Sequence, residues 1–235
     1  MNPLSSKLAS SPALARVVPF GLFLLLTFLQ GQFGEAGRYW GYFGKSLVGA
    51  VLVWLAWPFV KEMRWKFSGA AVLVGIGVFA MWVGIDPFVP NQQELWIKLG
   101  LSKPPEHPPL PWNPFAQFGE GSGLGWFFVG ARILGSSLVV PPLEEVFYRS
   151  FMYRWIAKPD FQSVSLGAFS LKPFLLTALV FGFAHNEWLA GILCAAAYQG
   201  LVCWKKNLGE AMTAHAITNF LLCLYIVARG QWQFW

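Results

Sequence analysis

Long apolar runs alternate with short polar segments along this chain of 235 residues. A helix needs about 20 apolar residues to cross the hydrocarbon core of a bilayer, and most of the runs approach that length. The pattern therefore predicts an all-α fold, a polytopic transmembrane helical bundle of about seven spans. We expect the spans near residues 17–29, 44–60, 69–89, 123–140, 173–184, 188–204 and 208–228.

The connections between the runs carry glycine, proline and charge. Residues 31–44 are rich in glycine and are expected to link the first two spans, and residues 91–122 form one long polar connection. Its segment KPPEHPPLPWNP, residues 103–114, cannot form a regular helix, because proline lacks the amide proton and its ring clashes with the preceding turn. Pro141 and Pro142 are expected to break or kink the fourth span, with a helix resuming over 143–157. No repeat is apparent, so we expect one integral membrane domain over 1–235.

Composition excludes a soluble protein, because 56% of the residues are hydrophobic and 12% are charged. The net charge of +6 does not indicate a nucleic-acid partner, since the basic residues lie between apolar runs, where they set topology. Successive basic clusters are separated by two spans, so all four clusters can lie on the cytoplasmic side together. This predicts a cytoplasmic N-terminus and an external C-terminus. The three cysteines lie in apolar stretches without CxxC spacing, which argues against a disulfide framework or a cysteine zinc site. The basic clusters are Lys7 with Arg16, residues 61–66, residues 149–172, and Lys205 with Lys206.

The stretch PPLEEVFYR places three charges in an apolar region, where charge is unfavourable and usually functional. On a helix, Glu145 and Arg149 share one face four residues apart, in the favourable order for an ion pair. Glu144 is turned by about 100° from Glu145, so it faces a different neighbour or a cavity. The spacing predicts one supporting and one working carboxylate.

Further polar residues fall at similar membrane depths. At a rise of about 1.5 Å per residue, Glu144 lies roughly 15 Å from Arg154. His185 and Asn219 lie roughly 20 Å in, and His215 roughly 14 Å, by the same count. In HAITN, His215 and Asn219 are four apart and can aim hydrogen bonds at one point, as an oxyanion site requires. The simpler alternative is that each histidine is a packed residue bonded to a neighbouring backbone.

Other protease constellations have less support. HExxH and GxSxG are absent, and the two aspartates lie at span ends or in loops. Ser136 and Ser137 are conceivable nucleophiles, but a GSS sequence is more typical of close helix packing. Buried glutamate and histidine can also form the proton relay of a transporter.

PPLEEVFYR, FGFAH and HAITN occur in this order and resemble the EExxxR, FxxxH and HxxxN motifs of the CAAX-processing protease and bacteriocin-immunity (CPBP/Abi) family. The resemblance covers roughly residues 123–228, the expected protease core. Ser150 stands where many members have glycine, a conservative departure. HNEWLAG, residues 185–191, is also similar to a bacterial exosortase-associated subgroup related to CAAX proteases.

The resemblance implies a glutamic-type intramembrane endopeptidase whose helices enclose a polar cavity. Glu144 would be the general base that activates water, with His185 helping to position it, and His215 with Asn219 would stabilise the oxyanion. Glu145 and Arg149 would form the supporting pair. The partners implied are the lipid bilayer and a membrane-associated peptide or protein substrate. The location expected is the bacterial inner, or plasma, membrane.

Three alternatives stay open at this point. We expect no metal or other cofactor, because the pairing of His215 with Asn219 suits an oxyanion better than a metal. However, Glu144, His185 and His215 are also a ligand set that zinc accepts, which would make the protein a zinc-dependent version of the same protease. The same fold can serve as a non-catalytic immunity or scaffolding protein, or as a proton-coupled carrier.

Overall fold

The computed structural model describes residues 3–106 and 110–235, and its regular secondary structure in these ranges is entirely helical. The predicted all-α class is therefore confirmed. Residues 1–2 of the expected domain and 107–109 of the proline-rich segment lie outside the described residues. The α-helices are α1 (Pro3–Ser10), α2 (Pro12–Gln30), α3 (Gly34–Ala56), α4 (Gly69–Ile85), α5 (Gln92–Lys98), α6 (Pro114–Phe118), α7 (Gly123–Leu134), α8 (Val140–Glu145), α9 (Tyr153–Ala157), α10 (Leu171–Phe183), α11 (Trp188–Lys205) and α12 (Leu208–Arg229).

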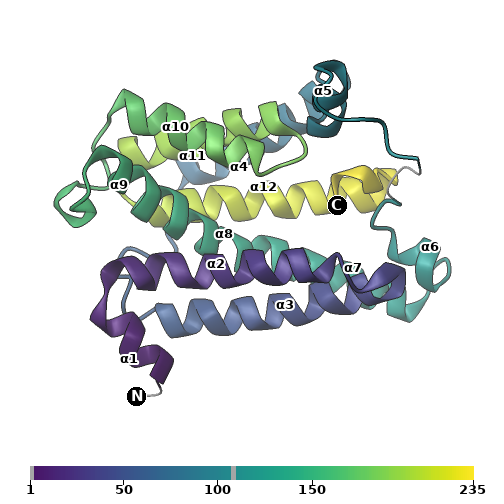
Figure 1. Cartoon of the computed structure of the whole chain (residues 1–235), viewed down its shortest axis with the longest axis horizontal. Helices are drawn as coiled ribbons and strands as arrows, with labels where there is room; N and C mark the ends of the chain where they lie inside the picture. The colour runs from purple at the N-terminus through teal and green to yellow at the C-terminus, as the bar shows by residue number, and fades with distance from the viewer. Residues whose placement is uncertain (1–2, 107–109) are drawn as a thin grey trace.

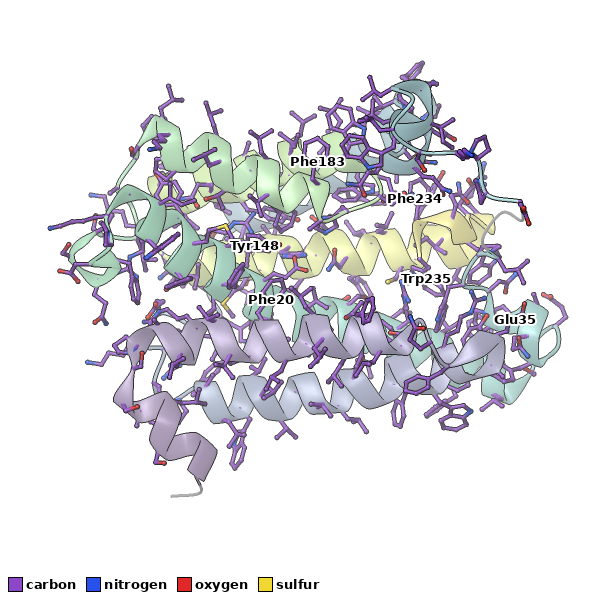
Figure 2. All side chains as sticks on the ribbon, in the orientation of Figure 1. Phe20, Glu35, Tyr148, Phe183, Phe234 and Trp235 are labelled. Carbon is purple, nitrogen blue, oxygen red and sulfur yellow. The ribbon has the colours of Figure 1, made fainter. Side chains whose placement is uncertain are left out.

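The long helices lie side by side along one axis (Figure 1). The α2 and α3 pair forms one side of the bundle, while α4, α10 and α11 form the other, with α12 between them. The π-helical segments η2 (Gly135–Val139) and η3 (Val146–Met152) join α7, α8 and α9 into one rod. Phe20 of α2 packs edge-on against Tyr148 of this rod, with ring centroids 5.4 Å apart (Figure 2). The rod is thereby fixed against α2 at the level of the two glutamates. Short 3-10 turns occur at η1 (Asp86–Phe88), η4 (Phe161–Ser163) and η5 (Trp232–Phe234).

Four described helical stretches are long and apolar enough to cross a membrane. Seven helical stretches correspond to the seven expected spans, but α3, α10 and α11 fall outside this set of four. Helix α10 has 13 residues, about 20 Å at 1.5 Å per residue, which is shorter than a hydrocarbon core of about 30 Å. Many large apolar side chains face outward, including Phe28, Trp54 and Leu73, as a lipid-facing surface requires. The four stretches are Pro12–Gln30, Gly69–Lys98, Gly123–Ala157 and Leu208–Arg229.

The fourth span was expected to break or kink at Pro141 and Pro142; it does not break, because the rod continues through both prolines, and the kink stays a prediction. They occupy the first turn of α8 and follow directly after the π-helical segment η2. The wider π turn hydrogen-bonds to the fifth residue back instead of the fourth, which relieves the clash that a proline ring makes in an α-helix. Glu144 and Glu145 consequently lie between two π segments.

The glycine-rich residues 34–44 are helical, although they were expected to be a connection. Helix α3 begins at Gly34, whose φ of 67° suits glycine, directly after a tight turn from α2. A Cβ at Gly41 would meet the Gln30 side chain at 3.0 Å, so the glycine permits close packing of α3 on α2. Tertiary packing here overrides the low helix propensity of glycine.

Basic segments from four connections gather at one end of the bundle. Arg16 lies 2.7 Å from Glu62, and Arg154 lies 3.8 Å from the same carboxylate. Burial acts to raise the pKa of the Glu62 carboxyl, but the charge of Arg16 and the hydrogen bond from Ser150 outweigh it and hold the pKa below its ordinary value of 4.5. Lys206 packs against the connection before α10, so all four basic segments share this end.

Candidate active site

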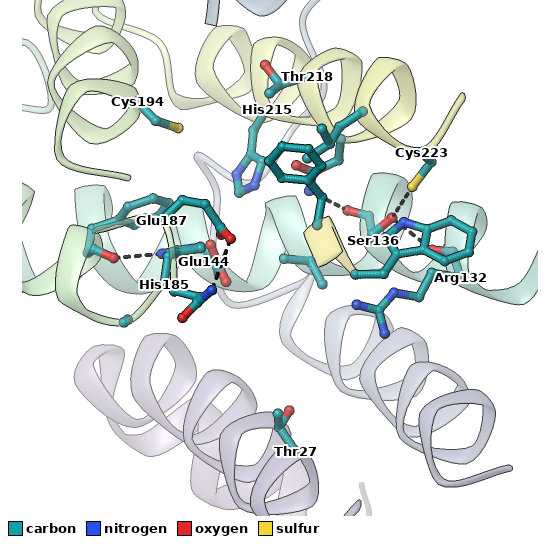
Figure 3. Close-up of a pocket in the computed structure, with 18 of the residues that line it drawn as sticks. Thr27, Arg132, Ser136, Glu144, His185, Glu187, Cys194, His215, Thr218 and Cys223 are labelled. Atoms are coloured by element: carbon teal, nitrogen blue, oxygen red, sulfur yellow. Dashed lines mark hydrogen bonds between the residues drawn. The ribbon is translucent and has the colours of Figure 1, made fainter. Parts of the chain in front are cut away.

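A cavity of about 410 Å³ lies inside the bundle (Figure 3). Its walls come from α2, α3, α4, the α7–α9 rod, α10 with the turn after it, α11, α12 and the C-terminal residues. The four residues predicted to be catalytic, Glu144, His185, His215 and Asn219, all line it. The structure thus brings together side chains from three elements in one cavity, while their membrane depth and their catalytic roles stay predictions.

The two adjacent glutamates on α8 face different surroundings. Glu144 lines the cavity, and its Oε2 is buried without a hydrogen-bond partner among the described residues. Glu145 is fully buried, with Oε1 2.9 Å from Nδ1 of His215 and Oε2 3.1 Å from Nε of Arg149. A buried carboxylate oxygen without a donor is unfavourable unless a ligand or water satisfies it. Glu144 is therefore the carboxylate available to react.

Arg149 is 1% exposed and holds its charge among aromatic rings. Its guanidinium carbon lies 4.6 Å from the ring centroid of Phe181 and 5.6 Å from that of Tyr198. The contact with Glu145 is short, but its angle does not make a hydrogen bond, and none of the three guanidinium nitrogens has a hydrogen-bond partner in the described chain. The pair is therefore held by charge attraction and by cation–π contacts.

The FxxxH spacing has a direct structural meaning at the end of α10. Nδ1 of His185 lies 2.7 Å from the backbone carbonyl oxygen of Phe181, four residues earlier. Carbonyl groups at a helix C-terminus lack the usual donor four residues on, and this one accepts from the Ala184 amide at 3.2 Å as well as from the histidine. A carbonyl oxygen can only accept, so Nδ1 must carry the proton and Nε2 is the nitrogen left to act on a ligand. The His185 ring also stacks on the Phe181 ring at 4.6 Å.

His215 and Asn219 lie one turn apart on α12. The His215 ring stacks on Tyr198 at 5.2 Å, and its Nδ1 faces the carboxylate of Glu145. The Tyr198 hydroxyl donates to Oγ1 of Thr218 at 2.8 Å, which fixes the stacking ring. Nδ2 of Asn219 donates to the backbone oxygen of Ser136 at 2.8 Å, leaving its second N–H unused. Each residue therefore has one N–H position held by protein and one polar position still available in the cavity.

Several cavity residues were not singled out from the sequence. Lys45 and Arg132 line the same cavity, as does Glu187 from the turn after α10. The available signal was a charged residue within a predicted apolar span, which applies to Lys45 and Arg132 as well as to Glu144.

Ser136 lines the cavity too, but its hydroxyl donates to the backbone oxygen of Arg132 at 2.8 Å, four residues earlier, as in ordinary helix packing.

The arrangement of the donor groups decides whether the cavity can hold a metal. Within residues 3–106 and 110–235, no three side chains of histidine, cysteine, aspartate or glutamate lie close enough together to hold one ion. Glu144, His185 and His215 line one cavity without forming a ligand set in their present positions, so no step is derived through a metal. The three cysteines are free.

Residues 123–221 match the family model described as type II CAAX prenyl endopeptidase Rce1-like. The resemblance predicted from the three motifs is thereby confirmed for this segment, which contains every predicted catalytic and supporting residue. Neither the curated proteins nor the solved structures gave a match. The match supports an intramembrane protease of CAAX type in general terms, while the exosortase-associated subgroup stays a prediction.

Proposed function

We propose that this chain, whose residues 123–221 carry the match to the Rce1-like endopeptidase family, is an intramembrane endopeptidase of glutamic type. Its substrate would be a membrane-associated peptide or protein that enters the cavity within the bilayer. The observation that carries the proposal is the buried, unpartnered Oε2 of Glu144 in a cavity shared with two histidines and an asparagine.

In the proposed reaction, Glu144 removes a proton from a water molecule that Nε2 of His185 helps to hold. The water oxygen attacks the peptide carbonyl carbon, and the carbonyl oxygen becomes negatively charged. The proton on Glu144 then passes to the leaving amine as the peptide bond breaks. Fixed donors in a site of low dielectric stabilise such a charge far better than water does, because they need no reorganisation.

His215 and Asn219 are the proposed oxyanion donors. Since the carboxylate of Glu145 lies 2.9 Å from Nδ1 of His215, that nitrogen carries a proton. Donation from Nε2 to an oxyanion then requires the second proton, so His215 would act as an imidazolium. The carboxylate of Glu145 would provide its counter-charge, and Nε of Arg149 lies 3.1 Å from the other oxygen of that carboxylate. The supporting pair would thus position the oxyanion donor.

The test is proteolysis of a membrane-peptide library by purified full-length protein, with metal content measured in the same samples. Glu144→Gln should reduce cleavage by about 10²–10⁴-fold, the usual contribution of a general base. The matched control is Glu120→Gln, an exposed glutamate outside the cavity, which should leave cleavage unchanged. Cleavage by Glu144→Gln at the wild-type rate would refute the proposal. One zinc per chain that disappears in His185→Ala would assign Glu144 and the histidines as ligands instead.

The proposed setting is a bacterial inner membrane with the basic end of the bundle in the cytoplasm. The gathering of four basic segments at one end supports this orientation, because lysine and arginine are enriched in cytoplasmic loops. Accessibility of a single cysteine introduced at Lys66 to a membrane-impermeant thiol reagent in intact cells tests it. Labelling without permeabilisation would reverse the orientation.

A further inference from the structure

Two basic side chains line the same cavity as the proposed catalytic residues but take no part in the proposed reaction. Lys45 extends from α3, and Arg132 from the last turn of α7. Figure 3 shows Arg132 across the cavity from His185 and Glu144. The cavity therefore has a catalytic region and, apart from it, a basic region.

The surroundings of Lys45 hold its amine at the cavity wall. The residue is 8% exposed, and Nζ donates to Oγ1 of Thr27 at 3.0 Å. The amine lies 5.1 Å from the ring centroid of Phe23 and 5.0 Å from that of Tyr42. A protonated amine has three donors, so one hydrogen bond leaves two for a ligand.

Arg132 is held in a comparable way. Its guanidinium carbon lies 4.6 Å from the ring centroid of Tyr42, 4.8 Å from that of Trp112 and 5.7 Å from that of Trp235. Aromatic faces position the planar group, while the N–H donors at its edge make no hydrogen bond to a described residue. Both cations contact the ring of Tyr42, so they lie close enough to act on one ligand.

No described carboxylate pairs directly with Lys45 or Arg132. The ion pairs among the described residues involve Glu62 and Glu145, and no carboxylate lies within 4.0 Å of Lys45 or Arg132. Positive charge inside a membrane helix bundle is strongly unfavourable unless a counter-charge or a polar ligand compensates it. Two such charges on one cavity wall are consequently a feature that a bound anion would explain.

We infer that Lys45 and Arg132 form an anion-binding subsite that holds a carboxylate of the peptide substrate, and this inference rests on the proposed function. A substrate group is favoured over a phospholipid phosphate because the cations share one cavity with Glu144, and 410 Å³ is within the usual size range for one bound ligand. The carboxylate belongs either to the C-terminus or to an acidic side chain. Binding it at a fixed place across the cavity would set which peptide bond reaches Glu144.

Binding measured apart from cleavage tests the inference. The full-length Glu144→Gln protein in neutral-lipid nanodiscs would be titrated with a dye-labelled apolar hexapeptide in four forms. Two forms end in a free carboxylate or an amide, and two amidated forms carry an internal glutamate or glutamine. The same titrations would use Lys45→Gln and Arg132→Gln in this background. Arg229→Gln, which alters an exposed arginine outside the cavity, is the matched control.

We expect one carboxylate form to bind at least about tenfold more tightly than its neutral partner, as a charge-assisted contact allows. Lys45→Gln and Arg132→Gln should each remove most of this preference and leave binding of the neutral form unchanged, whereas Arg229→Gln should retain the preference. The form that shows the preference identifies the carboxylate as terminal or side-chain.

Equal binding of acid and neutral forms, binding of neither form, or a preference that survives both substitutions would overturn the inference. A preference that vanishes when phosphatidylglycerol replaces neutral lipid would also overturn it and assign the subsite to a lipid phosphate. Cleavage of the same peptides by protein with intact Glu144 separates the two proposals. Cleavage without an acid preference refutes only the subsite, and an acid preference without cleavage refutes only the protease.

Discussion

Glu145 contacts both an arginine and a histidine of the site, and replacing it with glutamine tests what its negative charge contributes to stability and activity. The side chain is fully buried and contacts both Arg149 and His215. Glutamine keeps the shape and can still accept the hydrogen bond from Nδ1 of His215, but it removes the negative charge. The substitution leaves Arg149, also buried, without a counter-charge and without any hydrogen bond from the described residues.

The expected loss of unfolding free energy is about 3–5 kcal/mol, because breaking a buried ion pair leaves one charge uncompensated in a medium of low dielectric. Replacing both members avoids that penalty. Glu145→Gln combined with Arg149→Met should therefore lie within about 1–2 kcal/mol of wild type, since an apolar side chain suits the aromatic surroundings of position 149. The coupling energy between the two sites should be at least about 2 kcal/mol.

Stability would be measured by unfolding in mixed detergent micelles, followed by far-UV circular dichroism, with Glu120→Gln as the exposed control. Proteolysis by the same samples separates packing from chemistry. The double variant should recover stability but stay about 10²–10³-fold less active, because a neutral amide does not stabilise an imidazolium at His215. Strictly additive losses of stability, or a fully active double variant, would show that charge at Glu145 does not serve the roles assigned to it.

Three further predictions concern other parts of the molecule. The pKa of Glu62 is held below 4.5, so its stabilisation is present above that pH and is lost as the pH falls through the depressed pKa. The Tm difference between wild type and Glu62→Gln should therefore shrink as the pH falls below 4.5, and a constant difference would contradict this. Tyr198→Phe removes the hydroxyl that bonds Thr218 and keeps the ring against His215, so it should cost about 1 kcal/mol of stability with cleavage within a few-fold of wild type; a large loss of cleavage would give the hydroxyl a direct role. Gly182→Ala places a Cβ 2.7 Å from a backbone oxygen of α11 and should destabilise by about 1–3 kcal/mol, whereas Gly77→Ala, with open space around it, should not; equal Tm values for the two variants would refute this packing argument.

The helical class and the meeting of the motifs could be predicted because both follow from local periodicity. Apolar run length indicates a membrane helix, and the rise per residue converts sequence distance into depth. Glu144 and His215 could therefore be placed near one level before any contact was known. The bond between Glu145 and His215 could not be predicted, because it depends on how α8 rotates against α12.

Side-chain contacts that depend on how helices pack together could also not be predicted from the sequence. The helical spacing predicted that Glu145 faces Arg149, and the structure shows that contact together with a second one to His215. The prolines and the glycine-rich segment were misjudged for a related reason. Their local preferences oppose a helix, but the π turn before Pro141 and the close packing at Gly41 make a helix possible. Tertiary contacts decided both cases.

The two glutamates show how one short stretch can provide both chemistry and support. Because consecutive side chains on a helix diverge by about 100°, adjacent carboxylates can have unlike surroundings with no change in the backbone. Glu145 faces a cation and a histidine, whereas Glu144 faces a cavity in which its Oε2 has no protein partner. The π segments lie directly before and after the helix that carries both glutamates, and such segments are common at functional sites. Deleting one residue between Glu145 and Arg149 would turn Arg149 by about 100° away from Glu145, so the supporting charge and the reactive carboxylate depend on the same local geometry.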